Sequence, residues 1–443
     1  MTRTARFLAI AAIGWGSIVL GRGTVVDAQY DAKPADGVPT FAKDVAPILY
    51  KNCTQCHRPG EIAPMSLLTY EDARPWAKSI RDEVSDGTMP PWHADAPHGT
   101  FLNDRRLTDA EKDTIVKWAS GGAPKGDPKD MPAAPAYTEG WSLGKPDAVF
   151  EMTEPYKLPA DGTIQYEYFY IPTNFTEPKW VKSVEIRPGN RQVVHHVLVY
   201  YRAAPDMQRT PAFKQDPMVA RTPPEDRTTG QRLSPRRQGL PAPRLIATYA
   251  PGTWSQVAPA GTAFRFEPGG VIELQVHYTT RGEAATDRTR VGLIYATEPA
   301  AKELRPGQFI NGSFTLPAGA GDVEVKADAE FLQDATVYGI FPHTHLRGKK
   351  WDYKMVLPDG TSTTILSVPN YDFNWQTYYM FKEPLQVPKG AKIVATAWYD
   401  NSAANKANPD PKMDVKWGDQ TWEEMQYTGV LFTPSIAPVP IVK

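Results

Sequence analysis

Cysteine is scarce in this 443-residue sequence, and net charge and long hydrophobic runs are almost absent. The only two cysteines, Cys53 and Cys56, leave a single possible disulfide pair. The 49 Lys and Arg residues are balanced by 50 Asp and Glu residues, which argues against binding to nucleic acid or to a membrane surface through positive charge. The hydrophobic content of 41% excludes global disorder. The 43 prolines favour short strands over long helices.

The N-terminus carries one short hydrophobic run, from Phe7 to about Leu20, preceded by Arg3 and Arg6. The run is shorter than the roughly 20 residues that span a bilayer, and no second run follows. Residues 26–28 suit a cleavage site, so residues 1–28 are predicted to be a secretory signal peptide. The mature protein is then periplasmic or secreted, without a transmembrane segment. An uncleaved anchor is the alternative, and the lack of a nearby cysteine excludes a lipoprotein anchor.

Residues 41–127 are the one convincingly helical region. Apolar residues with helical spacing begin at Phe41, a second helix is expected over 70–84, and the capping box of Thr108 and Glu111 opens a third. Residues 128–147, which follow, are rich in proline and are predicted to form a flexible linker.

From about residue 148 onward, short runs of alternating apolar and polar residues recur between Gly, Pro and Asn residues. This pattern predicts an all-β structure of sandwich type. The region is long enough for two sandwiches, and a break near 297–305 divides it into 148–300 and 301–443. Residues 203–244 interrupt the pattern as a loop rich in Pro and Arg. The predicted fold is therefore multidomain, with a small all-α domain followed by two all-β domains.

Cys53-Thr54-Gln55-Cys56-His57 has the C-x-x-C-H spacing of a c-type heme attachment motif. Two thiols at this spacing can add to the vinyl groups of heme, and His57 then ligates the iron. A thioredoxin-like redox pair is disfavoured because no βαβ pattern surrounds the motif, and a zinc site would lack a fourth ligand. We therefore predict covalent heme c, which agrees with export because this heme is attached outside the cytoplasm.

Met89 is the predicted sixth ligand of the heme iron. It lies in the loop Gly87–Trp92, between the second and third predicted helices, and a thioether there would raise the heme potential. Small c-type cytochromes use such a loop, and residues 41–127 resemble one over their whole length. The alternative sixth ligands are Met65, His93 and His98.

Five of the eight histidines fall in the β region, in two groups: His195, His196 and His277, and then His343 and His345. Residues i and i+2 of a strand face the same way, so the second group can bind one ion together. The adjacent pair of the first group would need a bulge or a strand end to do so. Imidazoles suit Cu, Zn, Fe and Ni, and the lack of a further cysteine excludes a blue-copper centre. Exposed or core histidines are the alternative.

The segments around these histidines resemble the copper type II, ascorbate-dependent monooxygenases over about residues 150–435. The resemblance implies two jelly-roll sandwiches, each with one copper ion, facing each other across an open cleft. It implies an electron-transfer copper and an oxygen-binding copper, the latter held partly by a soft thioether that favours Cu(I). The matching segments are Val194–Val197, Gln275–Tyr278, His343–Gly348, Tyr371–Gln376 and Glu424–Met425. The implied ligands are His195, His196 and His277 for the first copper, and His343, His345 and Met425, also the catalytic residues, for the second.

The sequence departs from the family at several positions. The family's disulfide cysteines are absent, including the one directly after the methionine, which is Gln426 here. Peptide-hydroxylating members bind a peptide carboxylate and its neighbours with Arg, Asn and Tyr side chains, and the matching positions here are Phe341, Tyr427 and Gly429. A peptide substrate is therefore not expected, and Phe341 suggests a less charged, more apolar substrate end.

The sequence thus predicts an exported monooxygenase that depends on heme and copper and hydroxylates a C–H bond of a small substrate with O₂. Electrons from a separate donor would enter through the heme, in place of ascorbate, and the flexible linker would raise the local concentration of the heme domain. We expect a monomer. One alternative is a copper and heme protein that relays electrons or binds copper without oxygenating a substrate. Another is a hydrolase or sugar-binding sandwich that binds no copper.

Overall fold

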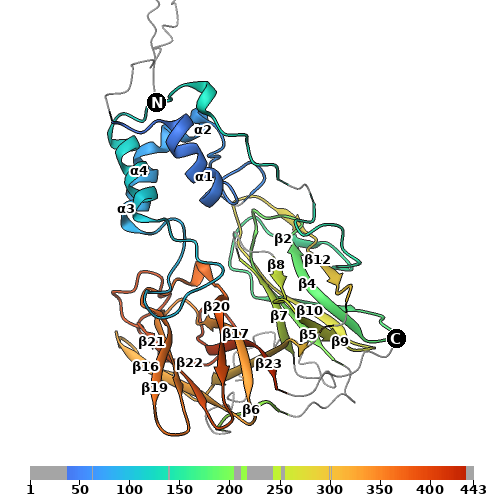
Figure 1. Cartoon of the computed structure of the whole chain (residues 1–443). Coiled ribbons are helices and arrows are strands. Elements are labelled where there is room, and N and C mark those ends of the chain that lie inside the picture. The colour runs from blue at the N-terminus through green and yellow to red at the C-terminus, as the bar shows by residue number, and fades with distance from the viewer. Residues whose placement is uncertain are drawn as a thin grey trace, which may run out of the picture.

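The computed structural model describes residues 37–435, apart from residues 62, 138–139, 204–210, 217–242, 251–254, 299 and 301. The predicted signal peptide and most of the 203–244 loop lie outside the described residues. Within the described part, no helix is long and apolar enough to cross a membrane. The described part of the chain is mostly β-sheet with few helices, and the α-helices gather at one end of the molecule (Figure 1).

The helices and the segments that join them, residues 37–131, form a helical unit with its own apolar core, centred on Phe41, Leu49, Ile115 and Trp118. The predicted capping box is confirmed, because Thr108 Oγ1 accepts the Glu111 N–H while the Glu111 carboxylate accepts the Thr108 N–H. The helices are the π-helix η1 (Phe41–Val45), α1 (Ala46–Asn52), α2 (Tyr70–Ala73), the 3₁₀-helix η2 (Arg74–Trp76), α3 (Ala77–Asp86), α4 (Asp109–Ser120) and the 3₁₀-helix η3 (Pro128–Asp130).

The first β unit has two main sheets, ordered β1-β12-β4-β9-β13, with β8 paired to β4, and β3-β10-β5-β7. Side chains from both sheets share one apolar core, as in a β-sandwich. The strands are β1 (Ala148–Glu151), β2 (Tyr156–Leu158), β3 (Glu167–Pro172), β4 (Lys179–Arg187), β5 (Val194–Arg202), β7 (Arg244–Tyr249), β8 (Ser255–Val257), β9 (Thr262–Phe266), β10 (Val271–Tyr278), β11 (Ala285–Asp287), β12 (Arg290–Tyr295) and β13 (Lys302–Glu303).

The second β unit also has two main sheets, ordered β14-β23-β17-β20 and β19-β18-β21-β16-β6, which share a second core. The short strand β6 comes from the 203–244 loop and joins this unit by pairing with β16. The strands are β6 (Phe213–Lys214), β14 (Arg305–Asn311), β15 (Thr315–Leu316), β16 (Val323–Phe331), β17 (Ala335–His343), β18 (Gly348–Val356), β19 (Ser362–Val368), β20 (Tyr379–Val387), β21 (Lys392–Tyr399), β22 (Val415–Lys416) and β23 (Gln426–Pro434), with the 3₁₀-helix η5 (Phe373–Trp375) between β19 and β20.

The segment between α3 and α4 leaves the helical unit and packs on the second β unit. Trp92 and Phe101 are buried in the second core, where the Trp92 ring lies 5.7 Å from Phe101 and 5.2 Å from Tyr379. Residues 100–102 pair with the outer edge of β20, through Leu102 N–H to Met380 O and Lys382 N–H to Thr100 O, both 2.8 Å. The sequence did not lead us to expect this contact, because the segment has no apolar period.

Hydrogen bonds hold the predicted linker at two of its described points. Tyr137 donates its hydroxyl hydrogen to Thr54 within the C-x-x-C-H motif, and the Arg58 guanidinium lies 4.0 Å from the centre of the Tyr137 ring. The Ser142 N–H donates to the Glu185 carboxylate over 2.8 Å, and the next N–H does so over 3.0 Å. The described residues on either side of 138–139 are therefore attached to the C-x-x-C-H motif and to β4, respectively.

Candidate functional site

The first histidine group lies where β5 and β10 pair. His196 stands opposite His277, but the next pair is Val194 with Tyr278, so His195 is an extra residue in β5. This β-bulge turns His195 toward the same side as its neighbour, and the two ring centres are 4.1 Å apart. The sequence required a bulge or strand end for these adjacent histidines to act together, and the structure has the bulge.

The second histidine group lies at the end of β17. The ring centres of His343 and His345 are 5.1 Å apart. His343 Nδ1 donates to the Gln376 side-chain oxygen over 2.7 Å, and His345 Nδ1 donates to the Glu423 main-chain oxygen over 3.1 Å. These bonds leave Nε2 as the free nitrogen of each ring, and Nε2 of His345 is buried without a partner among the described residues.

All five histidines are neutral near pH 7, as metal ligands must be. Burial lowers the pKa of every one of them, and it lowers the pKa of His343 to about 4. Both ring nitrogens of His277 are buried without a hydrogen-bond partner among the described residues. An unpaired buried polar atom costs about 1–3 kcal/mol, a cost that a bound metal ion would remove. The donor chemistry of both groups therefore fits copper.

The two groups do not face each other across an open cleft, as the resemblance implied. The Tyr166 ring stacks on His277 with ring centres 3.3 Å apart, and its centre is 6.2 Å from His345. Gln376 lies between the groups, with its oxygen on His343 and its nitrogen 3.4 Å from His196 Nδ1. In the described part of the chain, no three His, Cys, Asp or Glu side chains are gathered closely enough to hold a metal ion. Phe373 also fills the space between the groups, with its ring centre 5.5–6.5 Å from those of His195, His196, His277 and His345.

A buried carboxylate joins the two segments that carry the second group and Met425. Glu424 is fully buried and accepts N–H hydrogen bonds from His345 over 2.8 Å, from Arg347 over 2.6 Å and from Met425 over 3.2 Å. Burial raises the pKa of Glu424 to about 7, and the three N–H donors and the Arg347 guanidinium oppose that shift. The Arg347 side chain is itself held by Asn401 and by the Trp422 main-chain oxygen, each at 2.8 Å. Glu424 therefore fixes His345 and Met425 relative to each other.

The C-x-x-C-H motif follows α1 directly and folds into a tight turn. The N–H groups of Cys56 and His57 both donate to the Cys53 main-chain oxygen, over 3.1 and 2.9 Å. Both cysteines are free, and burial raises the pKa of the Cys53 thiol to about 12. Burial lowers the pKa of His57, whose Nδ1 is buried without a partner among the described residues. Two free thiols and a neutral imidazole in one turn fit covalent attachment of heme.

The candidates for a sixth heme ligand lie in different surroundings. Met65 packs against the same helical core as Cys53. Met89 is half-buried at the C-terminal end of α3, where its N–H donates to Glu83 O over 3.2 Å. His93 lies beside the second β unit, because its neighbours Trp92 and Ala94 are buried in that unit's core. His98 is half-buried in the loop that precedes the β20 contact. Ligation by Met89 stays a prediction.

Sequence reasoning gave no role to Tyr166, Phe373, Gln376 or Glu424. The last three lie in segments that carried the family resemblance, so their sequence position was a usable signal. Tyr166 had no such signal, because only its contacts with His277 and His345, far along the chain, mark it.

Comparison with known proteins identifies one part of the chain. Residues 324–425 match the family model described as copper type II ascorbate-dependent monooxygenase, C-terminal domain. No curated protein matches the chain.

Solved structures show only distant likeness. The major capsid protein P2 of bacteriophage PM2 is 7% identical, with 65% of this chain and 97% of that one covered and a TM-score of 0.25. Allantoicase from Saccharomyces cerevisiae is 8% identical, with 62% and 80% covered and a TM-score of 0.18. The subviral particle protein VP2 of infectious bursal disease virus is 10% identical, with 65% and 72% covered and a TM-score of 0.18. Scores this low carry no argument about fold or function. The chain thus carries a copper type II monooxygenase-like C-terminal domain at residues 324–425, the stretch that contains His343, His345 and Met425.

Proposed function

We propose that the protein is an exported monooxygenase that depends on copper and heme c and hydroxylates a C–H bond of a small substrate. One observation carries the proposal. His343 and His345 lie inside the stretch that matches the monooxygenase family, and both side chains are buried and neutral. Each also donates its Nδ1 hydrogen to a neighbouring oxygen, which leaves Nε2 available for a metal ion. The first histidine group, held in place by the bulge in β5, lies beside them.

The residues that would hold copper are those of the two groups. His195, His196 and His277 would bind an electron-transfer copper, and His343, His345 and Met425 would bind an oxygen-binding copper. Imidazole and thioether ligands suit copper, and the thioether favours Cu(I). When bound, copper would supply the reduction of O₂ that hydroxylation requires.

The chain's own residues orient the imidazoles and exclude water. Gln376 and the Glu423 main-chain oxygen fix the tautomers of His343 and His345, as outer-shell partners of metal ligands do. Phe341 is buried and stacks on His343 with ring centres 6.0 Å apart, and Tyr378 stacks on Phe341 at 4.9 Å. This aromatic wall favours an apolar substrate end over a peptide carboxylate.

Heme c would be bound to Cys53 and Cys56, and His57 and Met89 would ligate its iron. When bound, it would supply the entry point for electrons from a separate donor. Attachment of this heme requires export, so the proposed location is the periplasm or the outside of the cell.

The test measures metal content and O₂ uptake in the purified full-length protein. We expect two copper ions per chain, with His277→Ala and His343→Ala each losing a different one, while His98→Ala keeps both. A substrate screen by O₂ uptake with reduced, copper-loaded protein should find turnover that His343→Ala abolishes. Wild-type protein without stoichiometric copper would overturn the proposal and favour a sandwich that binds no copper.

A second candidate function is an electron relay without oxygenation. It is favoured by Tyr166 and Phe373, which fill the space between the two histidine groups. Electron passage from heme to copper without O₂ uptake on any substrate would support the relay.

A further inference from the structure

We propose that Glu61 docks the loop after the C-x-x-C-H motif onto the first β unit, so that electrons reach the first histidine group from a fixed position. Glu61 is thus a positioning residue. This inference rests on the proposed function, and it replaces the flexible tether expected from the sequence with a docked helical unit.

The docking contact is a partly buried cluster of one carboxylate and two guanidinium groups. The Glu61 side chain is only 5% exposed and forms ion pairs with Arg58, at 2.7 Å, and with Arg191. Arg58 belongs to the same loop, but Arg191 belongs to the first β unit. Because little water reaches these groups, the ion pair is screened less than a surface pair, and loss of one partner leaves buried charge uncompensated.

Both partners of the ion pair lie close along the chain to a predicted ligand, Glu61 to His57 and Arg191 to His195. Glu61 follows His57 by four residues, and Arg191 precedes His195 by four residues, a reach of at most about 14 Å on each side. Arg191 lies in the turn that leads into β5, which is fixed because the Val194 N–H donates to Asn190 O over 3.2 Å. The ion pair therefore joins the turn of the heme motif to the strand end that carries the bulge.

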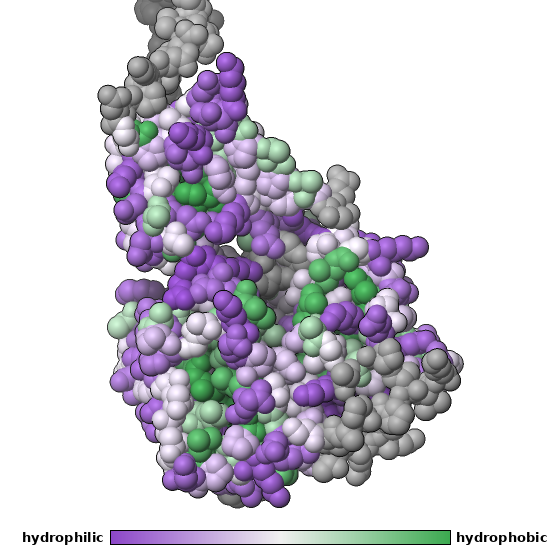
Figure 2. Space-filling model, in the orientation of Figure 1, coloured by the Kyte–Doolittle hydropathy of each residue, from purple (hydrophilic) through white to green (hydrophobic). Residues whose placement is uncertain are grey.

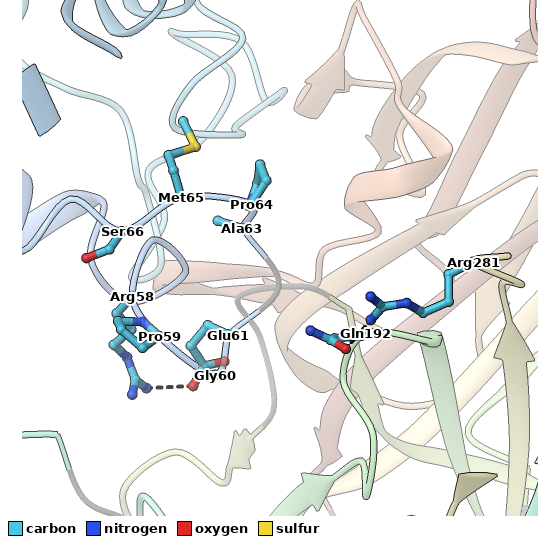
Figure 3. Close-up of a pocket in the computed structure, with 10 residues that line it drawn as sticks. All are labelled: Arg58, Pro59, Gly60, Glu61, Ala63, Pro64, Met65, Ser66, Gln192 and Arg281. Atoms are coloured by element: carbon cyan, nitrogen blue, oxygen red, sulfur yellow. Dashed lines mark hydrogen bonds and ion pairs between the residues drawn. The ribbon is translucent and has the colours of Figure 1, made fainter. Parts of the chain in front are cut away.

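A cavity of about 540 Å³ lies along the same junction (Figure 3). One side is formed by residues 58–61 and 63–66, and the other by Gln192 and Arg281, which come from the turns beside β5 and β10. Arg281 donates to the Gln192 side chain, so these two turns are also linked to each other. Figure 2 shows hydrophilic residues gathered where the helical unit meets the β units, as expected for a junction held by ion pairs.

A buried tyrosine of the same sheet lies near this ion pair. Burial raises the pKa of Tyr249, the Arg191 guanidinium opposes that rise, and the Glu61 carboxylate adds to it. Tyr249 pairs with Val197 of β5, two residues beyond His195.

A second contact prevents the helical unit from turning about Glu61. Trp92 and Phe101 are buried in the core of the second β unit, and His93 lies near Asp372. The Asp372 carboxylate also acts on the pKa of His195. The helical unit is thus held on both β units, and both contacts lead to the region of the histidines.

The test compares hydrogen exchange in wild-type protein, Glu61→Gln and Arg191→Gln. Each variant should speed amide exchange about tenfold in residues 58–61 and 189–194, because either one opens the junction. The double variant Glu61→Arg with Arg191→Glu should restore slow exchange, because the new carboxylate again faces two guanidinium groups. Glu71→Gln is the matched control, since it removes an ion pair with Lys125 (2.6 Å) inside the helical unit and should leave residues 189–194 unchanged.

A second measurement follows the rate at which reduced heme passes its electron to copper, which should fall about tenfold in both single variants and recover in the double variant. Unchanged exchange at residues 189–194, or no rescue by the double variant, would overturn the docking. Faster exchange with an unchanged electron-transfer rate would overturn the positioning role. Exchange is measured without substrate or O₂, so failure of the oxygenase proposal leaves this result intact.

Discussion

Replacing Glu424 by glutamine tests how the peptide around His345 and Met425 is held. The carboxylate receives three N–H groups, two on one oxygen and one on the other. A glutamine has the same shape but only one acceptor oxygen, so its amide group would face the Arg347 N–H donor. One buried N–H then loses its partner, at about 1–3 kcal/mol.

We therefore expect Glu424→Gln to lower the free energy of unfolding by about 1–3 kcal/mol and to weaken binding of the copper proposed for His343, His345 and Met425. Glu423→Gln is the matched control, because that neighbouring carboxylate is half-buried and accepts the Gln420 N–H over 2.9 Å. Its cost should stay below about 1 kcal/mol. Urea unfolding and copper content, measured on both variants, decide the question. Equal losses in the two variants would refute the reasoning.

Replacing Met425 by isoleucine changes the side-chain volume little, so the protein should still fold. The copper–sulfur signal in X-ray absorption of the reduced protein should vanish in this variant. A signal that survives would assign the sulfur to another methionine. Replacing Cys53 and Cys56 together by serine should remove heme from the denatured protein on a gel, and heme that acid solvent extracts fully from the wild type would contradict covalent attachment. Burial lowers the pKa of His93, so the folded protein takes up this proton less readily than the unfolded chain, and stability should fall as the pH drops below about 6.5. Urea midpoints at about pH 7.5 and pH 5.5 should differ less in His93→Gln than in the wild type, and equal differences would contradict this.

Local patterns were predictable from the sequence. The capping box at Thr108 depends only on two residues three positions apart. Side chains alternate between the faces of a strand, so the adjacent His195 and His196 can bind one ion only if the strand has a bulge or ends there. The alternating runs likewise indicated the mostly β character of the chain after residue 148, since alternation directly reflects burial on one face.

Contacts between distant segments were not predictable. Tyr166 enters the space between the histidine groups because of how the sheets pack, and no local pattern marks it for that place. The proline-rich segment 128–147 has the composition of a flexible linker, yet Tyr137 is tied to Thr54 and the Ser142 N–H to Glu185. Composition indicates how flexible an isolated segment is. It does not indicate which hydrogen-bond partners the folded protein brings to that segment.

The pairing of residues 100–102 with β20 bears on the solubility of the β region. β20 is the last strand of its sheet, and an uncovered outer strand is a ready template for pairing with another chain. The segment that covers it carries Phe101, which stands opposite Phe381, and it is made on the ribosome long before the strand itself. When β20 is made, a segment that can pair with its first residues is therefore already present in the same chain. A β region produced without residues 100–102 would leave the main-chain groups of Met380 and Lys382 open to pairing with another copy.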